Sequence, residues 1–487
     1  MTSKTIFFLL IFLILLQSAV SQLRLPAVIS DNMVLQRNAE AMIWGWDNPG
    51  VQVNVRAGWT LDEFEAKADA NGEWSVILPT TIAGGPYNIY IKGSNEIVVS
   101  NILLGDVWIC SGQSNMEYRI SWMGGWGNPW FEMDSIDIEK NKYPLIRLFQ
   151  LEKNASDTPL SDFEGEWMSV NTGTVAEFSA VAFFFGRELN RKIAVPVGLV
   201  STNWGGTPAE AWISAKELEE NKDLAFYAER DYSNEEEHRK PSRLYNAMIH
   251  PMVKMSITGV IWYQGEANRH DALHYRKLFP AMIKDWRKQF NQGDFPFYYV
   301  QIAPYNYDKP MGGALVREAQ LMALEVPGTG MVVTTDIGDP ENIHPVKKQE
   351  VGRRLARNAL ALHYGVKGLT YSGPIFERME IGEEDGIKKA RLFFTHIARR
   401  LESTGGDPGC FEIAGDDRVF YEAQALIEGD NVIVWSDKVS NPVAVRFGFK
   451  NASEPNLYNS EGLPASPFRT DDWEVNTGVS NDLLNES

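Results

Sequence analysis

Four short segments of the sequence gather hydroxyl, amide, carboxyl and imidazole groups around glycine, and each follows a run of β-favouring residues. In chain order they are 112–116 (GQSNM), 203–207 (NWGGT), 264–268 (QGEAN) and 336–345 (DIGDPENIHP). A serine, a histidine and several potential hydrogen-bond donors are the groups that nucleophilic attack on an ester carbonyl requires. The four segments therefore predict acyl-transfer chemistry.

Ser114 and His344 are the candidate reacting pair. A serine hydroxyl is a weak nucleophile until a base removes its proton, and an imidazole titrates near neutral pH. The tetrahedral intermediate carries an oxyanion, which needs donors held in position before the reaction. We expect these donors to be the backbone N–H of Gly206, in a Gly-Gly turn, and the side-chain amide of Asn268.

Each of these residues has an ordinary structural explanation when it is taken alone. Ser114 would be a turn residue, Gly206 part of a tight turn, Asn268 a helix N-cap and His344 a satisfied loop histidine. Four such explanations at four successive strand ends are improbable together. The set therefore favours catalysis.

Residues 105–368 contain the elements that must position these groups. Apolar runs, the strand candidates, alternate there with longer helical segments, predicted over 179–192, 274–290, 314–325 and 347–363. Near-continuous apolar strands are typical of a parallel sheet covered on both faces, and the alternation predicts an α/β domain. Ligand sites in such sheets lie at the carboxyl ends of the strands, so we expect the four segments to meet along one edge.

The regions on either side of 105–368 have a different pattern, without the longer helical segments. Residues 22–104 consist of short alternating β runs between Gly, Pro and Asn turns, which predicts a small β-sandwich. Residues 369–487 predict a second β module. Residues 1–21 have a lysine, an apolar run and small residues before Ser21, the pattern of a signal peptide, with a retained anchor as the alternative. The mature chain is then expected to be secreted or periplasmic.

Composition limits the partners. The formal net charge of −18 argues against nucleic acid or an anionic membrane surface. Two cysteines, Cys110 and Cys410, exclude a disulfide scaffold; they could pair, but a buried strand position is favoured for Cys110. His270 and His274 have metal-ligand spacing without a matching Glu, so a solvated helix face is favoured and no metal or other cofactor is expected.

The four segments resemble, in order, the blocks of the SGNH hydrolase superfamily. They are more similar still to the sialate O-acetylesterase family, and the resemblance covers nearly the whole mature chain, including the C-terminal NLYNSEGLPASPFRTDDW. It implies a flavodoxin-like α/β/α catalytic domain that hydrolyses acetyl esters on sugars. It also implies Ser114 as nucleophile, His344 as general base, and an oxyanion hole made by the N–H groups of Ser114 and Gly206 with the Asn268 amide.

The final segment departs from the superfamily pattern. An Asp often stands three residues before the histidine, or bacterial relatives read Asn-Asp-Ile-His, whereas this chain has Glu341-Asn342-Ile343-His344. Glu341 is the first candidate to orient the imidazole, and Asp336 or Asp339 could also reach it. A backbone carbonyl holding the ring, which would leave a Ser–His dyad, is equally open.

The substrate is less constrained than the chemistry. Sialic acid carries a carboxylate, for which Arg119 or Arg269 could serve, but an acetylated xylan or other hemicellulose is an alternative. An inactive carbohydrate-binding protein on the same fold is an alternative of another class. Sugar faces pack on aromatic rings, and 118–133 offers Trp122, Trp126 and Trp130 in an expected loop beside Ser114. The candidate substrate-binding residues within the four segments are Gln113, Trp204, Gln264 and Glu266.

Overall fold

The computed structural model describes residues 22–124, 138, 140, 142–384 and 386–475. At its centre lies a sheet with the strand order β13-β12-β11-β7-β10-β8-β9. All neighbours on this path are parallel except the edge pair β8 and β9. The strands are β7 (Glu96–Gly112), β8 (Ile146–Leu151), β9 (Gly165–Ser169), β10 (Val197–Asn203), β11 (Gly259–Tyr263), β12 (Phe297–Val300) and β13 (Thr329–Val332).

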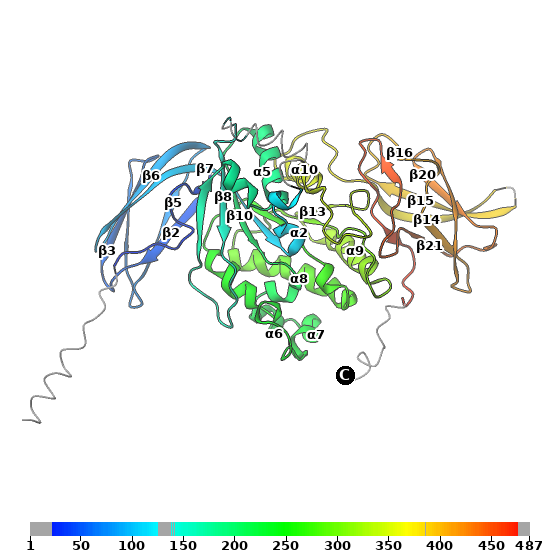
Figure 1. The fold of residues 1–487 in the computed structure, drawn as a ribbon, viewed down its shortest axis with the longest axis horizontal. Helices are drawn as coiled ribbons and strands as arrows, with labels where there is room; N and C mark the ends of the chain where they lie inside the picture. The colour runs from blue at the N-terminus through cyan, green and yellow to red at the C-terminus, as the bar shows by residue number, and fades with distance from the viewer. Residues whose placement is uncertain (1–21, 125–137, 139, 141, 385, 476–487) are drawn as a thin grey trace, which may run out of the picture.

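Both faces of the central sheet are buried. On β7, Val107 and Ile109 belong to one hydrophobic cluster, while Trp108 and Cys110 belong to another. The first cluster includes α8 (Ala272–Phe290) and α9 (Gly312–Met322), and the second includes α5 (Ala180–Ile193) and α10 (Lys348–Asn358). In Figure 1, α5 and α10 lie above the sheet and α8 below it. The mixed α/β fold with a sheet covered on both faces confirms the expectation from the apolar strands.

The predicted helices agree closely with the observed ones. α8 begins two residues before the predicted start, and α9 continues as a 3-10 turn, Ala323–Glu325. α10 continues as a π-helical turn over Ala359–His363. The predicted helix 347–363 is therefore α-helical in its first part and π-helical at its end.

Gly352 allows α10 to pack closely on α5. A Cβ at this position would lie 2.8 Å from the Cβ of Phe184, the backbone nitrogen of Phe185 and the backbone oxygen of Val181. Two of these atoms belong to the backbone of α5, which cannot move aside as a side-chain end can. A side chain here would therefore push α10, and the segment that leads into it, away from α5.

The N-terminal strands form a β module that is joined to the central sheet without a break. β2 (Glu40–Trp46) pairs with β5 (Glu73–Pro79), and β3 (Gln52–Ala57) pairs with β4 (Glu63–Lys67) and β6 (Gly84–Lys92). β6 pairs with the first part of β7, whose second part runs through the central sheet. The boundary predicted at residue 104 therefore falls inside one continuous strand.

The C-terminal residues add further β-sheets. One has the strand order β14-β15-β20-β19 and another the order β18-β17-β21-β23, and β16 pairs with β22. Figure 1 shows them on the side of the central sheet opposite the N-terminal strands. Their bounds are β14 (Ile375–Glu384), β15 (Ile387–Thr395), β16 (Leu401–Ser403), β17 (Phe411–Ala414), β18 (Phe420–Glu422), β19 (Gln424–Glu428), β20 (Asn431–Trp435), β21 (Ala444–Phe447), β22 (Leu457–Asn459) and β23 (Phe468–Arg469).

Polar contacts fasten these sheets to the central one. The guanidinium of Arg317, on α9, is buried and donates to the backbone carbonyls of Lys450 and Asn451. The Gln301 amide donates to the Ser466 hydroxyl at 3.0 Å.

Several expectations concern cysteines, membrane contact and terminal segments. Cys110 is a free, buried thiol and Cys410 a free, exposed one, so they do not pair. No helix of the described residues has the length and apolar character that crossing a membrane requires. The predicted signal peptide, together with Trp126 and Trp130, lies outside the described residues.

Gly352→Ala is expected to lower the free energy of unfolding by about 1–2 kcal/mol. Overpacking costs about 1–3 kcal/mol, and contact with fixed backbone places this site at about 2–3 kcal/mol. The gain of about 1 kcal/mol when alanine replaces glycine in a helix offsets part of that cost. Gly382→Ala is the control, since no atom lies within 4 Å of a Cβ there. Chemical denaturation measures both variants. A Gly352→Ala protein as stable as the wild type would show that the two helices are not in tight contact.

Candidate active site

The carboxyl ends of three adjacent strands lie level with one another. Gly112, the last residue of β7, is in register with Asn203 at the end of β10 and with Tyr263 at the end of β11. The segments that carry Ser114, Gly206 and Asn268 therefore leave the sheet at the same edge. The fourth segment follows β13 and reaches the same place, because His344 contacts Ser114.

A sharp turn presents Ser114. It is the first residue of the short helix α2 (Ser114–Glu117), which begins two residues after β7 ends. Gly112 has a φ of +142°, and a Cβ there would collide with the backbone of Tyr263. Glycine is required at this position for both reasons, and the turn that it permits directs Ser114 away from the strand.

The hydroxyl of Ser114 is hydrogen-bonded to the imidazole of His344, with 2.8 Å between Oγ and Nε2. The backbone N–H of His344 donates to Oδ1 of Asn342 at 2.9 Å, which fixes the loop locally. Burial lowers the pKa of His344, the charge of Lys348 lowers it further, and Glu117 opposes both. A lowered pKa favours the unprotonated imidazole, which is the form that can accept the serine proton.

No carboxylate supports the far side of this imidazole among the residues that the structure describes. The carboxylate of Glu341 accepts from the Asn306 amide at 2.6 Å, and that of Asp336 pairs with Arg354 at 2.6 Å. Asp339 accepts from the backbone N–H of Glu341. All three candidate acids thus have other partners, and the arrangement is that of a Ser–His pair.

The Gly-Gly turn packs directly against Ser114. A Cβ at Gly205 would lie 3.3 Å from the Cβ of Ser114, and the Gly205 N–H donates to Glu117 at 2.7 Å. Gly206 has a φ of +77°, and its carbonyl accepts from Arg239. Within the described part of the chain, the N–H groups of Ser114 and Gly206 have no hydrogen-bond partner, so both can bind a developing oxyanion.

Asn268 is fully buried and held on every side. Its Oδ1 accepts from the Gln264 amide at 2.7 Å and from the backbone N–H of Ala209 at 2.9 Å. Its Nδ2 donates to Glu210 at 2.9 Å and lies 3.5 Å from Asp271. α8 begins at Ala272 with Asp271 as its N-cap, so Asn268 is not the cap of that helix.

The acids around Asn268 are a feature that the sequence reasoning did not single out. Burial and, next to it, the charge of Asp271 together raise the pKa of Glu210 to about 8. Burial also raises the pKa of Asp271, to about 6. Their only signal in the sequence is position, since Glu210 follows the Gly-Gly segment and Asp271 stands three residues after Asn268.

The predicted substrate-binding residues divide into two groups. Gln113, Gln264 and Glu266 are buried. The side-chain oxygen of Gln113 accepts from the backbone N–H groups of Gly265 and Ala267 at 3.3 and 3.2 Å. All three side chains form hydrogen bonds between or within the loops at the strand ends, and none is open to solvent. Trp204 is half-buried; it stacks on His238 with ring centroids 4.5 Å apart, and Lys153 lies over its ring.

Other residues near Ser114 were predicted to meet the substrate. Trp122 is exposed and packs edge-on against Tyr118, while Arg119 lies over the Trp122 ring and pairs with Glu177 at 2.6 Å. His274, from the predicted solvated face of α8, is half-buried instead and stacks on Phe226.

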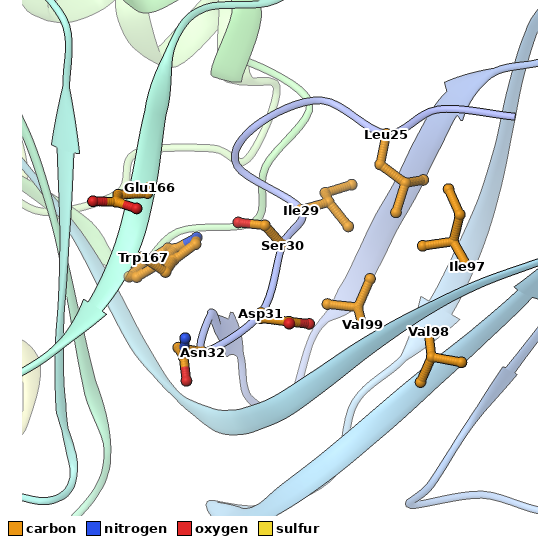
Figure 2. A pocket seen from close by; sticks show the side chains of 10 residues that line it. All are labelled: Leu25, Ile29, Ser30, Asp31, Asn32, Ile97, Val98, Val99, Glu166 and Trp167. Atoms are coloured by element: carbon orange, nitrogen blue, oxygen red, sulfur yellow. The ribbon is translucent and has the colours of Figure 1, made fainter. Parts of the chain in front are cut away.

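A separate pocket lies between the N-terminal strands and the edge strand β9 (Figure 2). Trp167 and Glu166 line it on the β9 side, and Asp31, Asn32 and Val98 line it on the other. It contains none of the predicted site residues.

A protein-family profile described as "Carbohydrate esterase, sialic acid-specific acetylesterase" matches residues 104–361, which include all four segments. The chain belongs to this family of carbohydrate esterases.

Its similarity to other members extends well beyond the profile. The sialate O-acetylesterases of Pongo abelii and Homo sapiens are each 33% identical to the chain, over 91% of its length and 92% of theirs. A crystal structure of a carbohydrate acetylesterase from Xanthomonas citri is 39% identical, with a TM-score of 0.82 over 93% of this chain and 100% of the other. This member of the family therefore shares both flanking β regions with its relatives.

Glu117→Gln is expected to move the acidic limb of the pH profile of kcat/KM to lower pH. Glu117 raises the pKa of His344, so its removal lets that pKa fall, and the base stays unprotonated in more acidic solution. The glutamine keeps an oxygen that can accept from Gly205. The measurement is kcat/KM against pH for an aryl acetate. An acidic limb that stays in place or moves to higher pH would contradict the effect of Glu117 on the His344 pKa.

Proposed function

We propose that this chain is a secreted carbohydrate O-acetylesterase that acts through an acyl-enzyme on Ser114. The observation that carries the proposal is the 2.8 Å hydrogen bond between Ser114 Oγ and His344 Nε2, at the strand ends where the family motifs meet. A serine in contact with an unprotonated imidazole has the activation that a hydroxyl nucleophile needs.

The reaction would proceed in two halves. His344 takes the Ser114 proton as Oγ attacks the acetyl carbonyl, and the oxyanion is met by the N–H groups of Ser114 and Gly206. His344 then returns the proton to the sugar oxygen, which leaves as an alcohol. Water, deprotonated by His344, attacks the acetyl-serine, and acetate leaves as Ser114 regains its proton.

Asn268 is proposed as the third oxyanion donor. One of its amide hydrogens is committed to Glu210 at 2.9 Å. The second hydrogen has the longer contact, 3.5 Å to Asp271, and would have to leave Asp271 for a stronger acceptor. A developing oxyanion is such an acceptor.

The wider organisation forms part of the same proposal. We propose an SGNH-type α/β/α catalytic domain over 105–368, with an N-terminal β-sandwich over 22–104 and a C-terminal β module over 369–487. Residues 1–21 would direct export and be removed, leaving a secreted or periplasmic enzyme.

The first candidate substrate is an O-acetylated sialic acid, since the family description and the mammalian relatives name sialic acid or sialate. A neutral acetylated glycan such as xylan is the second candidate, and two contacts favour it. Arg119 pairs with Glu177 at 2.6 Å, and the Arg269 guanidinium donates to the backbone carbonyl of Glu266 at 3.1 Å. Each of the two arginines considered for a sialate carboxylate thus already has a hydrogen-bond partner.

Ser114→Ala and His344→Ala are each expected to reduce hydrolysis of an aryl acetate by at least about 10³-fold, because each removes half of the reacting pair. Steady-state rates measure this, with circular dichroism as the check that the variants are folded. Ser114→Ala at the wild-type rate would overturn the mechanism and leave the carbohydrate-binding alternative.

Acetate release from O-acetylated sialic acid and from acetylxylan, measured side by side, decides the substrate. If the engaged arginines exclude a carboxylate, the neutral glycan has the higher kcat/KM. Higher kcat/KM for the sialic acid would reject the second candidate and require one of these arginines to exchange its partner.

A further inference from the structure

Asn115, the residue directly after the nucleophile, joins three parts of the site. It is fully buried, and its Nδ2 donates to the Glu266 carboxylate at 2.6 Å and to the backbone carbonyl of Ile343 at 3.0 Å. Its Oδ1 accepts from the ammonium of Lys348. One side chain therefore connects the Ser114 segment, the Glu266 segment and the loop that ends in His344.

The two charged partners of Asn115 are out of solvent. Lys348, the first residue of α10, has no exposed surface, and Glu266 is 3% exposed. Isolated buried charges are costly, and each of these two has a hydrogen bond to Asn115 that offsets part of that cost. Lys348 also lies 4.9 Å from the ring centre of Tyr118 and 5.4 Å from that of Tyr263, which adds cation–π attraction.

Resting on the proposed function, we propose that Lys348 is a positioning residue, which acts through Asn115 to hold His344 against Ser114 in place of the carboxylate behind the imidazole. Asn115 binds the carbonyl immediately before His344 and is bonded through the backbone to Ser114. The amide cannot rotate, because an ammonium holds its oxygen and a carboxylate holds its nitrogen. The distance between nucleophile and base is thereby fixed without a third catalytic acid.

Lys348 also acts on His344 through its charge. It lowers the pKa of His344, whereas a triad carboxylate would raise it. Burial lowers the pKa of Lys348 itself to about 7, and Glu266 opposes that shift. The titratable or charged groups beside Lys348 are Glu266, Tyr118 and Tyr263. Glu117, which pairs with Lys153, lies beside His344. Arg269 lies beside Glu266.

The test compares Lys348→Met, Lys348→Arg and Lys347→Met in the full-length mature protein. Lys347 adjoins Lys348 but is exposed, so its charge is screened and its removal is the matched control. For Lys348→Met we expect kcat on an aryl acetate to fall about 10- to 100-fold with little change in KM, as small misplacement of a base does. The acidic limb of kcat/KM should move to higher pH, because the charge that lowers the His344 pKa is gone.

Lys348→Arg keeps the charge and should keep the acidic limb at its wild-type position, and Lys347→Met should match the wild type throughout. If Lys348→Met loses activity while the acidic limb of its kcat/KM profile stays at the wild-type pH, Lys348 has only a structural role. That result would overturn the proposal. An unchanged kcat in that variant would overturn it as well.

A double variant separates positioning from the cost of leaving Glu266 without its counter-charge. Lys348→Met/Glu266→Gln removes both buried charges, and it also replaces the single variant if that one fails to fold. If Lys348 acts by positioning His344, the double variant keeps a low kcat, and its acidic limb of kcat/KM stays at the higher pH. Full recovery of kcat would overturn the proposal. Ser114→Ala is assayed in parallel, because wild-type activity there rejects the acyl-enzyme itself, independently of any result at Lys348.

Discussion

The hydrogen bond between Ser114 and His344 joins two residues that are 230 positions apart, and the rest of the structure makes that contact possible. A hydrogen bond tolerates only a few tenths of an ångström of error, so every element between the two residues must be placed accurately. The parallel order of β12, β11, β7 and β10 brings three strand ends to one level, and α10 holds the fourth segment over them.

Packing beneath the site serves the same end. Gly112 lets β7 turn sharply where it touches Tyr263, and Gly352 lets α10 approach α5. Both glycines stand where a side chain would meet backbone, which cannot yield. The Ser114–His344 contact is thus supported from the sheet side by one close approach and from the helix side by another.

Much of this could be predicted from the sequence. Apolar strands alternating with helical segments gave the central α/β sheet and the helix positions, because burial on two faces imposes a pattern that a single sequence carries. The meeting of the four segments followed from parallel strands having their carboxyl ends together. The Ser114–His344 pair was predictable for the same reason, since few other residues at that edge have suitable chemistry.

The partners of the polar side chains were not predictable in this way. Glu341 lies three residues before His344 but accepts from the Asn306 amide, and the buried Gln264 amide donates to Asn268. Such choices depend on rotamers and on contacts between distant segments, which periodicity does not encode. The continuity of β7 through residue 104 was missed because a change in pattern resembles a boundary even where the strand continues. Lys348 stands three residues after the fourth segment, and only its contact with Asn115 gives it a role.

We propose that Ser114 is the nucleophile and that His344 activates it. The most direct measurement is mass spectrometry of the protein after treatment with a serine-directed phosphonate, with residual esterase activity followed in the same sample. We expect a single adduct on the peptide that contains Ser114, formed in step with loss of activity and greatly slowed in His344→Ala. Activity that persists after Ser114 is fully modified, or inactivation by an adduct at another residue, would contradict it.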